Sequence, residues 1–289
     1  MTRSTLIAPS PALAACVRAY VTRSTLRADL TGEERRNQFP PTPTCVITWV
    51  IQGQDTRVGW SESPEVGVQT RMPIVFSGPH TKASISDNPG PVQLFTLLIY
   101  PDAVHALTGV DIAAHMNRFS AFSDVLDASW QCLARAVLDA PNDALRVQLI
   151  EDFLIPRWQA LRPAESMQPG QFLDWSNSVA SRATQQIRGH SDRQVDRRIK
   201  TWTGQALRQL RGIGRAEDSL LRAHKALASN NLNWSDIAAD SGFSDQAHLC
   251  REFRRITGFS PSELKKLISH ESYWMYQVWA KVSPQPLHE

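Results

Sequence analysis

Arginine residues recur at helical spacing in the segment Ser244 to Thr257, near the C-terminal end of the chain. On a helical wheel of about 100° per residue, Leu249, Phe253 and Ile256 share one face and Arg251 points the opposite way. A guanidinium group can donate two hydrogen bonds at once to O6 and N7 of guanine. This face therefore has the chemistry of base recognition, unless its arginines are solvated side chains of an ordinary surface helix.

A shorter amphipathic segment around Ile237 and Ala238 precedes this helix and is separated from it by Gly242. Ala238 is small enough for two helices to cross closely, and Gly242 stands where a tight turn needs positive φ. Ser244 is an N-cap type of residue and predicts that the second helix begins there. A short helix, a glycine turn and a second helix with a basic face are typical of a helix-turn-helix that places its second helix in the major groove.

The same residues resemble a known signature. Asp-Ile-Ala at 236–238 is followed, from Gly242 to Pro261, by Gly-Phe-Ser-Asp-Gln-x-His-Leu-x-Arg-x-Phe-Arg-Arg-x-Thr-Gly-x-Ser-Pro. This run resembles the C-terminal signature of the AraC/XylS family of bacterial transcription regulators. The resemblance implies two helix-turn-helix units joined by a linker helix, double-stranded DNA as partner, and RNA polymerase as a further partner if the protein activates transcription.

An upstream copy of the unit is found at Gly189 to Gly204, which has the same serine, arginine and Thr-Gly ending about 54 residues earlier. The copy is one residue shorter between the serine and the first apolar anchor. Its helical wheel places Val195, Ile199 and Trp202 inward and Arg193, Arg197 and Lys200 outward. We expect its preceding helix within Leu173 to Ile187, and a connecting helix at Gln205 to Ser229 that Gly212 and Gly214 weaken and could break in two.

The two predicted recognition helices supply the candidate DNA contacts. Arg197 and Arg251 are each central on a free face and are the candidates for guanine recognition, while Gln246 is positioned to read adenine. Lys200, Arg254 and Arg255 are expected to contact DNA phosphates. Such contacts position the protein without specifying sequence. The predicted DNA-binding residues are Arg193, Gln194, Arg197, Lys200, Gln246, His248, Arg251, Arg254 and Arg255.

Charge is distributed unevenly over the 289 residues, whose net charge is +3. Residues 172–269 hold 16 Lys and Arg against 10 Asp and Glu, whereas residues 1–171 hold 14 against 16. A basic module joined to a slightly acidic one is typical of a polyanion-binding domain that carries a second domain. The Pro- and Gly-containing stretch 162–170 is the predicted linker. The expected domains are therefore residues 1–165, β-rich and regulatory, and residues 166–289, which bind DNA and end in an aromatic tail.

Short apolar and β-branched runs separated by turn residues fill the first hundred positions. The predicted strands are 44–51, 57–60, 67–69, 74–77, 82–85 and 92–100, and their spacing indicates an all-β sandwich or barrel. Helices follow near 103–107, 125–138 and 145–161. The polar run Thr31 to Asn37 is predicted as a loop. The family resemblance implies a cupin-like barrel here. The expected fold is α+β: a β-rich, cupin-like barrel with helices, then an all-α domain of two helix-turn-helix units.

Enzymatic and metal chemistry find little support in the sequence. The eight histidines include no His-x-His pair, the four cysteines are scattered, and no nucleotide-binding or nucleophile motif is present, so we predict no cofactor, no metal and no catalysis. Trp49, Arg71, His80 and Tyr100 could line a small-molecule pocket, but core aromatics with a surface arginine and histidine are the favoured explanation for each, so none is predicted as a ligand contact.

Three roles stay open for residues 1–165. They could sense a small-molecule effector, dimerise the chain without binding a ligand, or catalyse a reaction in a bifunctional protein. The sequence contains no signal peptide pattern and no apolar run long enough to span a membrane, so a cytoplasmic location is expected.

Overall fold

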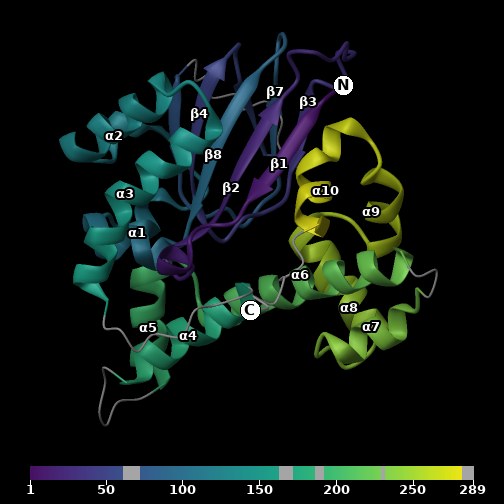
Figure 1. The fold of residues 1–289 in the computed structure, drawn as a ribbon. Coiled ribbons are helices and arrows are strands. Elements are labelled where there is room, and N and C mark those ends of the chain that lie inside the picture. The colour runs from purple at the N-terminus through teal and green to yellow at the C-terminus, as the bar shows by residue number, and fades with distance from the viewer. Residues whose placement is uncertain (61–71, 163–171, 186–191, 229–231, 282–289) are drawn as a thin grey trace.

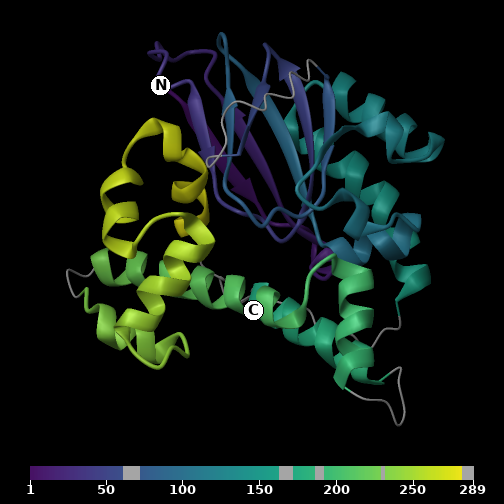
Figure 2. The ribbon, with the colours of Figure 1, turned by 180° about the vertical axis from the view of Figure 1, so that it is seen from behind.

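Residues 1–60, 72–162, 172–185, 192–228 and 232–281 are described by the structure, a computed structural model. Strands occupy one end of the molecule, and the helices of the C-terminal half run along the opposite end and up one side (Figure 1). Helices from the middle of the chain cover the remaining side of the strands, as the rear view also shows (Figure 2).

The strands form two antiparallel sheets. The larger has the order β1 (Arg3–Ile7), β2 (Val17–Ser24), β8 (Gln93–Ile99), β4 (Cys45–Gln52), β6 (Ile74–Ser77) and β9 (Phe119–Ala121). The smaller has the order β3 (Arg36–Phe39), β7 (Ser84–Asp87) and β5 (Thr56–Trp60). Among the described strands no pairing joins one sheet to the other, so the sheets are open and the expected closed barrel is wrong.

Most strand predictions are confirmed. The apolar runs at 44–51, 57–60, 74–77 and 92–100 become β4, β5, β6 and β8, and the run at 82–85 lies slightly ahead of β7. The prediction at 67–69 lies outside the described residues. The loop expected at Thr31 to Asn37 ends early, because Arg36 and Asn37 already pair with Asp87 and Ser86. Nothing in this short polar sequence shows that pairing; the strand exists because β7 lies beside it.

Both faces of the larger sheet are buried, which explains why β4 is apolar on both sides. Cys45, Ile47 and Trp49 point into a core shared with α1 (Pro101–Thr108), α2 (Ala128–Asp139) and α3 (Asp143–Leu161). Val46 and Thr48 point the other way, toward the smaller sheet and a cavity. The larger sheet is therefore the central layer of the N-terminal half.

Asp102 does not cap α1, although aspartate is a favoured N-cap residue. The helix begins at Pro101 and Tyr100 is its N-cap residue, without a side-chain hydrogen bond. The buried Asp102 carboxylate instead accepts hydrogen bonds from Trp175 Nε1 at 2.9 Å and from Arg182 Nη2 at 2.5 Å, both on a later helix. Asp111 caps the 3-10 turn Ile112–His115 (η2), and its side chain accepts a hydrogen bond from the backbone N–H of Ala113.

Seven α-helices are described in the C-terminal half. They are α4 (Phe172–Gln185), α5 (Asp192–Thr203), α6 (Leu207–Ala228), α7 (Trp234–Asp240), α8 (Gln246–Thr257), α9 (Pro261–Leu267) and α10 (Trp274–Lys281), with a 3-10 turn η4 (Glu271–Tyr273) before the last. The connecting helix α6 is continuous, so Gly212 and Gly214 do not break it. A Cβ atom at Gly212 would lie 3.3 Å from Arg255 Nη2, so the end of the Arg255 side chain of α8 lies against this glycine.

The two halves pack against each other over a continuous hydrophobic core that includes Trp175, Ile199 and Phe253 beside the sheet residues. Trp175 of α4 stacks on Tyr100 with ring centroids 4.8 Å apart and planes 9° from parallel. Arg18 of β2 forms a buried ion pair with Glu217 of α6. The predicted domain boundary at 165 and most of the predicted linker lie outside the described residues.

Candidate nucleic-acid interface

The start of α8 is set by a carboxylate. Asp245, and not Ser244, is the N-cap residue, and its side chain accepts a 2.6 Å hydrogen bond from the backbone N–H of His248. That hydrogen bond is the main reason that the pKa of Asp245 is lowered. Ser244 instead lies 3.0 Å from the His248 ring, Oγ to Nδ1. Asp and Ser are both favoured N-cap residues, so the sequence alone did not separate them.

A glycine turn holds α7 against α8. Gly242 has φ +74°, a value that glycine adopts at little cost. Ala238 is fully buried at the crossing of the two helices, and Phe243 packs there with Leu249. The guanidinium of Arg215, on α6, lies 5.5 Å from the centre of the Phe243 ring. These contacts confirm the predicted helix, turn and helix, and they join the pair to the connecting helix.

The outward face of α8 carries the predicted DNA contacts. Leu249, Phe253 and Ile256 are buried, and Gln246, Arg251, Arg254 and Arg255 are exposed while His248 is half-buried. The hydroxyl of Ser235, on α7, donates to Gln246 Oε1 at 3.2 Å. The sequence did not predict this contact, which links Gln246, the first residue of α8, to α7.

Helix α5 repeats this face. Ile199 is buried, Val195 and Trp202 are half-buried, and Arg193, Gln194, Arg197 and Lys200 are exposed. Helices α5 and α8 each have 12 residues. Counted from the first residue of each helix, Arg197 and Arg251 hold the same position and are therefore counterparts. The structure therefore places both guanine-reading candidates at the same helical position.

The ends of the two helices are alike in atomic detail. Thr203 Oγ1 donates to Ile199 O at 2.8 Å and accepts from the backbone N–H of Gln205 at 3.2 Å. Thr257 Oγ1 makes the corresponding contacts with Phe253 O at 2.8 Å and the N–H of Phe259 at 3.2 Å. In both cases the next residue is a glycine at positive φ, as helix C-termini commonly require. The Thr-Gly repeat in the sequence is thus a repeated helix stop.

The exposed cations differ in their partners. Lys200 Nζ lies 3.3 Å from Asp196, Arg254 Nη2 lies 2.8 Å from Glu263, and Arg255 Nη2 lies 2.9 Å from Glu252. Arg197 and Arg251 pair with no carboxylate in the parts of the chain that the structure describes. The three predicted phosphate contacts are thus held by neighbouring carboxylates, whereas the two predicted base contacts remain available.

The two helix-turn-helix units lie apart along α6. In both ribbon views, α4 and α5 are near one end of the row of helices and α7 and α8 near the other, at the end of the molecule away from the sheets (Figures 1 and 2). The 22 residues of α6 give it a length of about 33 Å at 1.5 Å per residue. This length is close to one turn of B-DNA, about 34 Å.

The preceding helices of the two units differ. Helix α7 has seven residues and buries Ile237 and Ala238, whereas α4 has 14 residues and buries Trp175 and Val179. Helix α4 begins at Phe172, one residue before the predicted range, and its end at Gln185 falls just short of the predicted limit at Ile187. Its Trp175 belongs to the contact with the N-terminal half, where it stacks on Tyr100.

Comparison with known sequences agrees with this geometry. A family model described as a helix-turn-helix domain, of the AraC type, matches residues 186–267, which include α5, α6, α7, α8 and α9.

Residues 186–267 are an AraC-type helix-turn-helix domain.

The AraC-type domain indicates a DNA-binding transcription regulator rather than an enzyme. The solved structures similar to the chain include ToxT from Vibrio cholerae O395 bound to (E)-4-(8-methylnaphthalen-1-yl)but-3-enoic acid, with 11% identity, a TM-score of 0.39, and coverage of 81% of this chain and 95% of that one. Unsaturated fatty acid bound ToxT from strain SCE256 has 11% identity, a TM-score of 0.35, and coverage of 93% and 94%. No curated protein matches the chain.

No helix in the described ranges is both long and apolar enough to cross a membrane. Over the same ranges, no three His, Cys, Asp or Glu side chains are grouped so that they could hold a metal ion.

Four residues were considered for a small-molecule pocket, and of these His80 lines a cavity. Trp49 donates to Ala134 O at 3.0 Å in the core, and Tyr100 stacks on Trp175. Arg71 is outside the described residues.

Proposed function

We propose that the chain regulates transcription by binding promoter DNA sequence-specifically, with α5 and α8 in two successive major-groove segments. The observation that carries the proposal is the repeated face. The same helical position presents Arg197 in one helix and Arg251 in the other, and both helices end in the same Thr-Gly arrangement. The length of α6 supports a spacing of about one DNA turn.

The roles of the side chains follow from their surroundings. Arg197 and Arg251 read guanine, Gln246 reads adenine, and Arg193, Gln194 and His248 flank them. Lys200, Arg254 and Arg255 contact phosphates after exchanging their carboxylate partners for the DNA backbone. Because the two helices carry different side chains, one chain recognises an asymmetric site.

In this proposal residues 166–289 bind DNA, and residues 1–165 regulate that binding in response to a small molecule. A cavity between the two sheets supports the effector role. A homodimer formed through residues 1–165, and contact with RNA polymerase if the protein is an activator, complete the proposed set of partners.

Selection of bound DNA from a random pool by the full chain tests the proposal. We expect a non-palindromic site with two conserved blocks about one helical turn apart. Inserting about five base pairs between the blocks rotates one of them to the far side of the duplex, and affinity should fall nearly to that of a single block. An unchanged affinity and footprint after the insertion would show that α5 and α8 do not read DNA as one rigid unit.

A further inference from the structure

A cavity of about 70 Å³ lies between the two sheets, and part of its wall comes from the far end of the chain. The larger sheet contributes Val46, Thr48 and Thr96, and the smaller contributes Phe39 and Ser84. The remaining wall includes Trp274 and Met275 of α10. A segment that follows the AraC-type domain thus closes a cavity of the N-terminal half.

The chemistry of the wall restricts what could bind. Its side chains are apolar or carry hydroxyl groups, apart from buried His80, whose ring lies edge-on to Phe119 with centroids 4.7 Å apart. No carboxylate, ammonium or guanidinium is among the side chains that line it. An occupant of such a site is uncharged, with an apolar body and one or two hydrogen-bonding groups.

The Trp274 side chain is held in the wall by specific contacts. Its ring nitrogen donates a 2.9 Å hydrogen bond to Asn37 Oδ1, and its ring meets Phe39 edge-on with centroids 5.8 Å apart. The Arg23 guanidinium lies 4.7 Å from the centre of the indole ring. Trp274 is 5% exposed, so α10 is docked and does not lie loosely on the surface.

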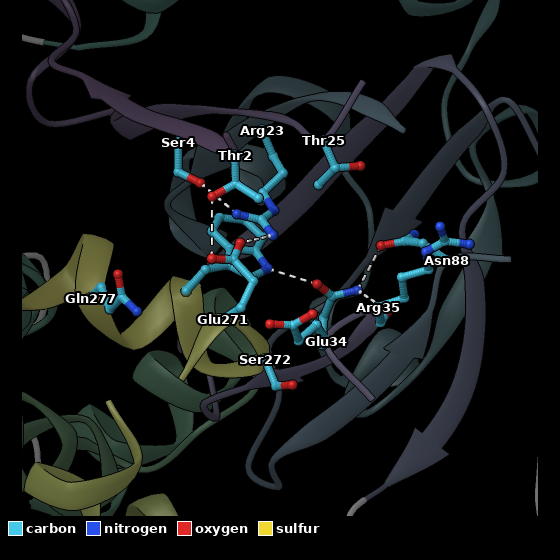
Figure 3. Close-up of polar contacts among 12 residues, drawn as sticks. Thr2, Ser4, Arg23, Thr25, Glu34, Arg35, Asn88, Glu271, Ser272 and Gln277 are labelled. Atoms are coloured by element: carbon cyan, nitrogen blue, oxygen red, sulfur yellow. Dashed lines mark hydrogen bonds and ion pairs between the residues drawn. The ribbon is translucent and has the colours of Figure 1, made fainter. Parts of the chain in front are cut away.

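The turn before α10 is fixed to the same sheets, as Figure 3 shows. Glu271 accepts from Arg23 Nη2 at 2.5 Å and from Thr2 Oγ1 at 3.2 Å, and Arg23 also donates to Ser4 Oγ at 3.0 Å. Arg23 is buried, and burial lowers its pKa although the Glu271 carboxylate opposes this effect. We call residues 271–278, which make these contacts, the clasp.

The clasp also touches the recognition helix. Tyr276 is buried and its hydroxyl donates to Thr257 O, at the last residue of α8, over 3.5 Å. Phe259, two residues further on, packs edge-on against Tyr273 and Tyr276. A displacement of the clasp therefore changes contacts at the end of α8.

The size of the cavity decides how it can be occupied. A cavity that binds benzene measures about 150 Å³, which is about twice the volume found with the indole of Trp274 in place. An occupant of that size fits only when the indole leaves. We propose that the cavity binds a small, uncharged, mainly apolar molecule in competition with Trp274, and that this competition releases the clasp from the sheets.

The regulatory role of this competition rests on the proposed function, because a ligand-responsive regulator needs its ligand site coupled to its DNA-binding helices. The coupling follows from linkage: an occupant that binds only the released state shifts the protein toward that state. By the same reciprocity, weakening the clasp must raise the affinity for the occupant.

Indole is the probe, since it is neutral, apolar and has one N–H that could donate to Asn37 in place of Trp274. We expect full-length Trp274→Ala to bind indole at least tenfold more tightly than the unmodified chain, by isothermal titration. In the unmodified chain, saturating indole should increase hydrogen exchange at the amides of residues 272–281. Trp274→Phe keeps a ring in the wall and should bind indole close to the unmodified level.

Equal indole affinity for Trp274→Ala and the unmodified chain would overturn the proposal, as would indole binding that leaves exchange at residues 272–281 unchanged. If Trp274→Ala does not fold by circular dichroism, Met275→Ala opens the same wall at a less buried position, and the same two outcomes apply. No DNA is present in these measurements. Their failure leaves the proposed DNA recognition standing, while a chain that binds indole as expected but selects no DNA site would refute the proposed function alone.

Discussion

Arg251 and Arg255 lie about one turn apart on α8 and share a solvent-exposed face, but their surroundings give them different roles. Arg255 is held by Glu252 at 2.9 Å, and this hydrogen bond is the main reason that the pKa of Glu252 is lowered. Arg251 is exposed and not paired in this way. A side chain without a competing carboxylate keeps its full donor set for a base edge, whereas a paired one must first give up its partner.

Substituting these two arginines separates base reading from phosphate anchoring. Arg251→Ala should cost about 1 to 3 kcal/mol on the preferred site and relax the preference at one base pair. Arg255→Ala should weaken binding to all sequences by a similar factor and reduce the salt dependence, because it removes a phosphate contact. Titrations on specific and random duplexes at two salt concentrations measure both effects. If the two variants lose affinity equally on both duplexes, the proposed docking of α8 is wrong.

At the scale of elements, α6 shows that glycine does not always end a helix. Gly212 lies on the face that α8 crosses, and the neighbouring atoms are the ends of the Arg255 and Glu252 side chains at 3.3 and 3.6 Å from an ideal Cβ. Packing on both sides of α6 offsets the poor helix propensity of the two glycines. Helix propensity alone therefore left open a break that tertiary packing prevents.

Gly212→Ala should stabilise the chain by about 0.5 to 1 kcal/mol, because alanine has the better helix propensity and the flexible Arg255 end can move aside. The melting temperature should rise by about 2 °C, measured by calorimetry. Gly78→Ala is the matched control. Its Cβ would lie 2.2 Å from the carbonyl oxygen of His115, and a backbone atom cannot move aside as a side-chain end can. This variant should melt lower, and a higher melting temperature for it would contradict the packing described there.

At the scale of the whole molecule, the polar contacts between the N-terminal half and the helices of the C-terminal half include three ion pairs among the described residues. These are Asp102 with Arg182, Arg18 with Glu217, and Arg23 with Glu271. The side chains of Arg18 and Glu217 are only 9% and 8% exposed. Removing only one partner of a buried ion pair strongly destabilises the folded protein, because the remaining charge is then uncompensated in a poorly solvated site.

Arg18→Met should therefore destabilise the chain by about 3 to 5 kcal/mol, and Arg18→Met combined with Glu217→Met should recover most of that loss. Chemical denaturation of the full chain measures both. The exposed pair of Arg36 with Asp87 is the control: its side chains are 46% and 45% exposed, and Arg36→Met should change the stability by no more than about 1 kcal/mol. A double variant as unstable as Arg18→Met alone would mean that the charge pair is not the source of the effect.

The sequence by itself determined the features that depend on near neighbours along the chain. Helical periodicity separated the buried Leu249 and Phe253 from the exposed Arg251, and it did the same in α5. The Thr-Gly endings and the apolar run of β4 were also readable, since a helix stop and a buried strand are encoded within a few residues. The aromatic residues of the tail were also visible in the sequence, and two of them, Trp274 and Tyr276, are buried.

Only the tertiary structure decided what these elements meet. β3 is a strand because β7 pairs with it, and the sheets stay open instead of closing into the expected barrel. Trp274 and its partner Asn37 are separated by 237 residues, and Arg23 and Glu271 by 248. Composition shows that an aromatic side chain must be buried, but burial is non-directional. The place where the clasp docks is set by hydrogen bonds and ring contacts that exist only once the two sheets have formed.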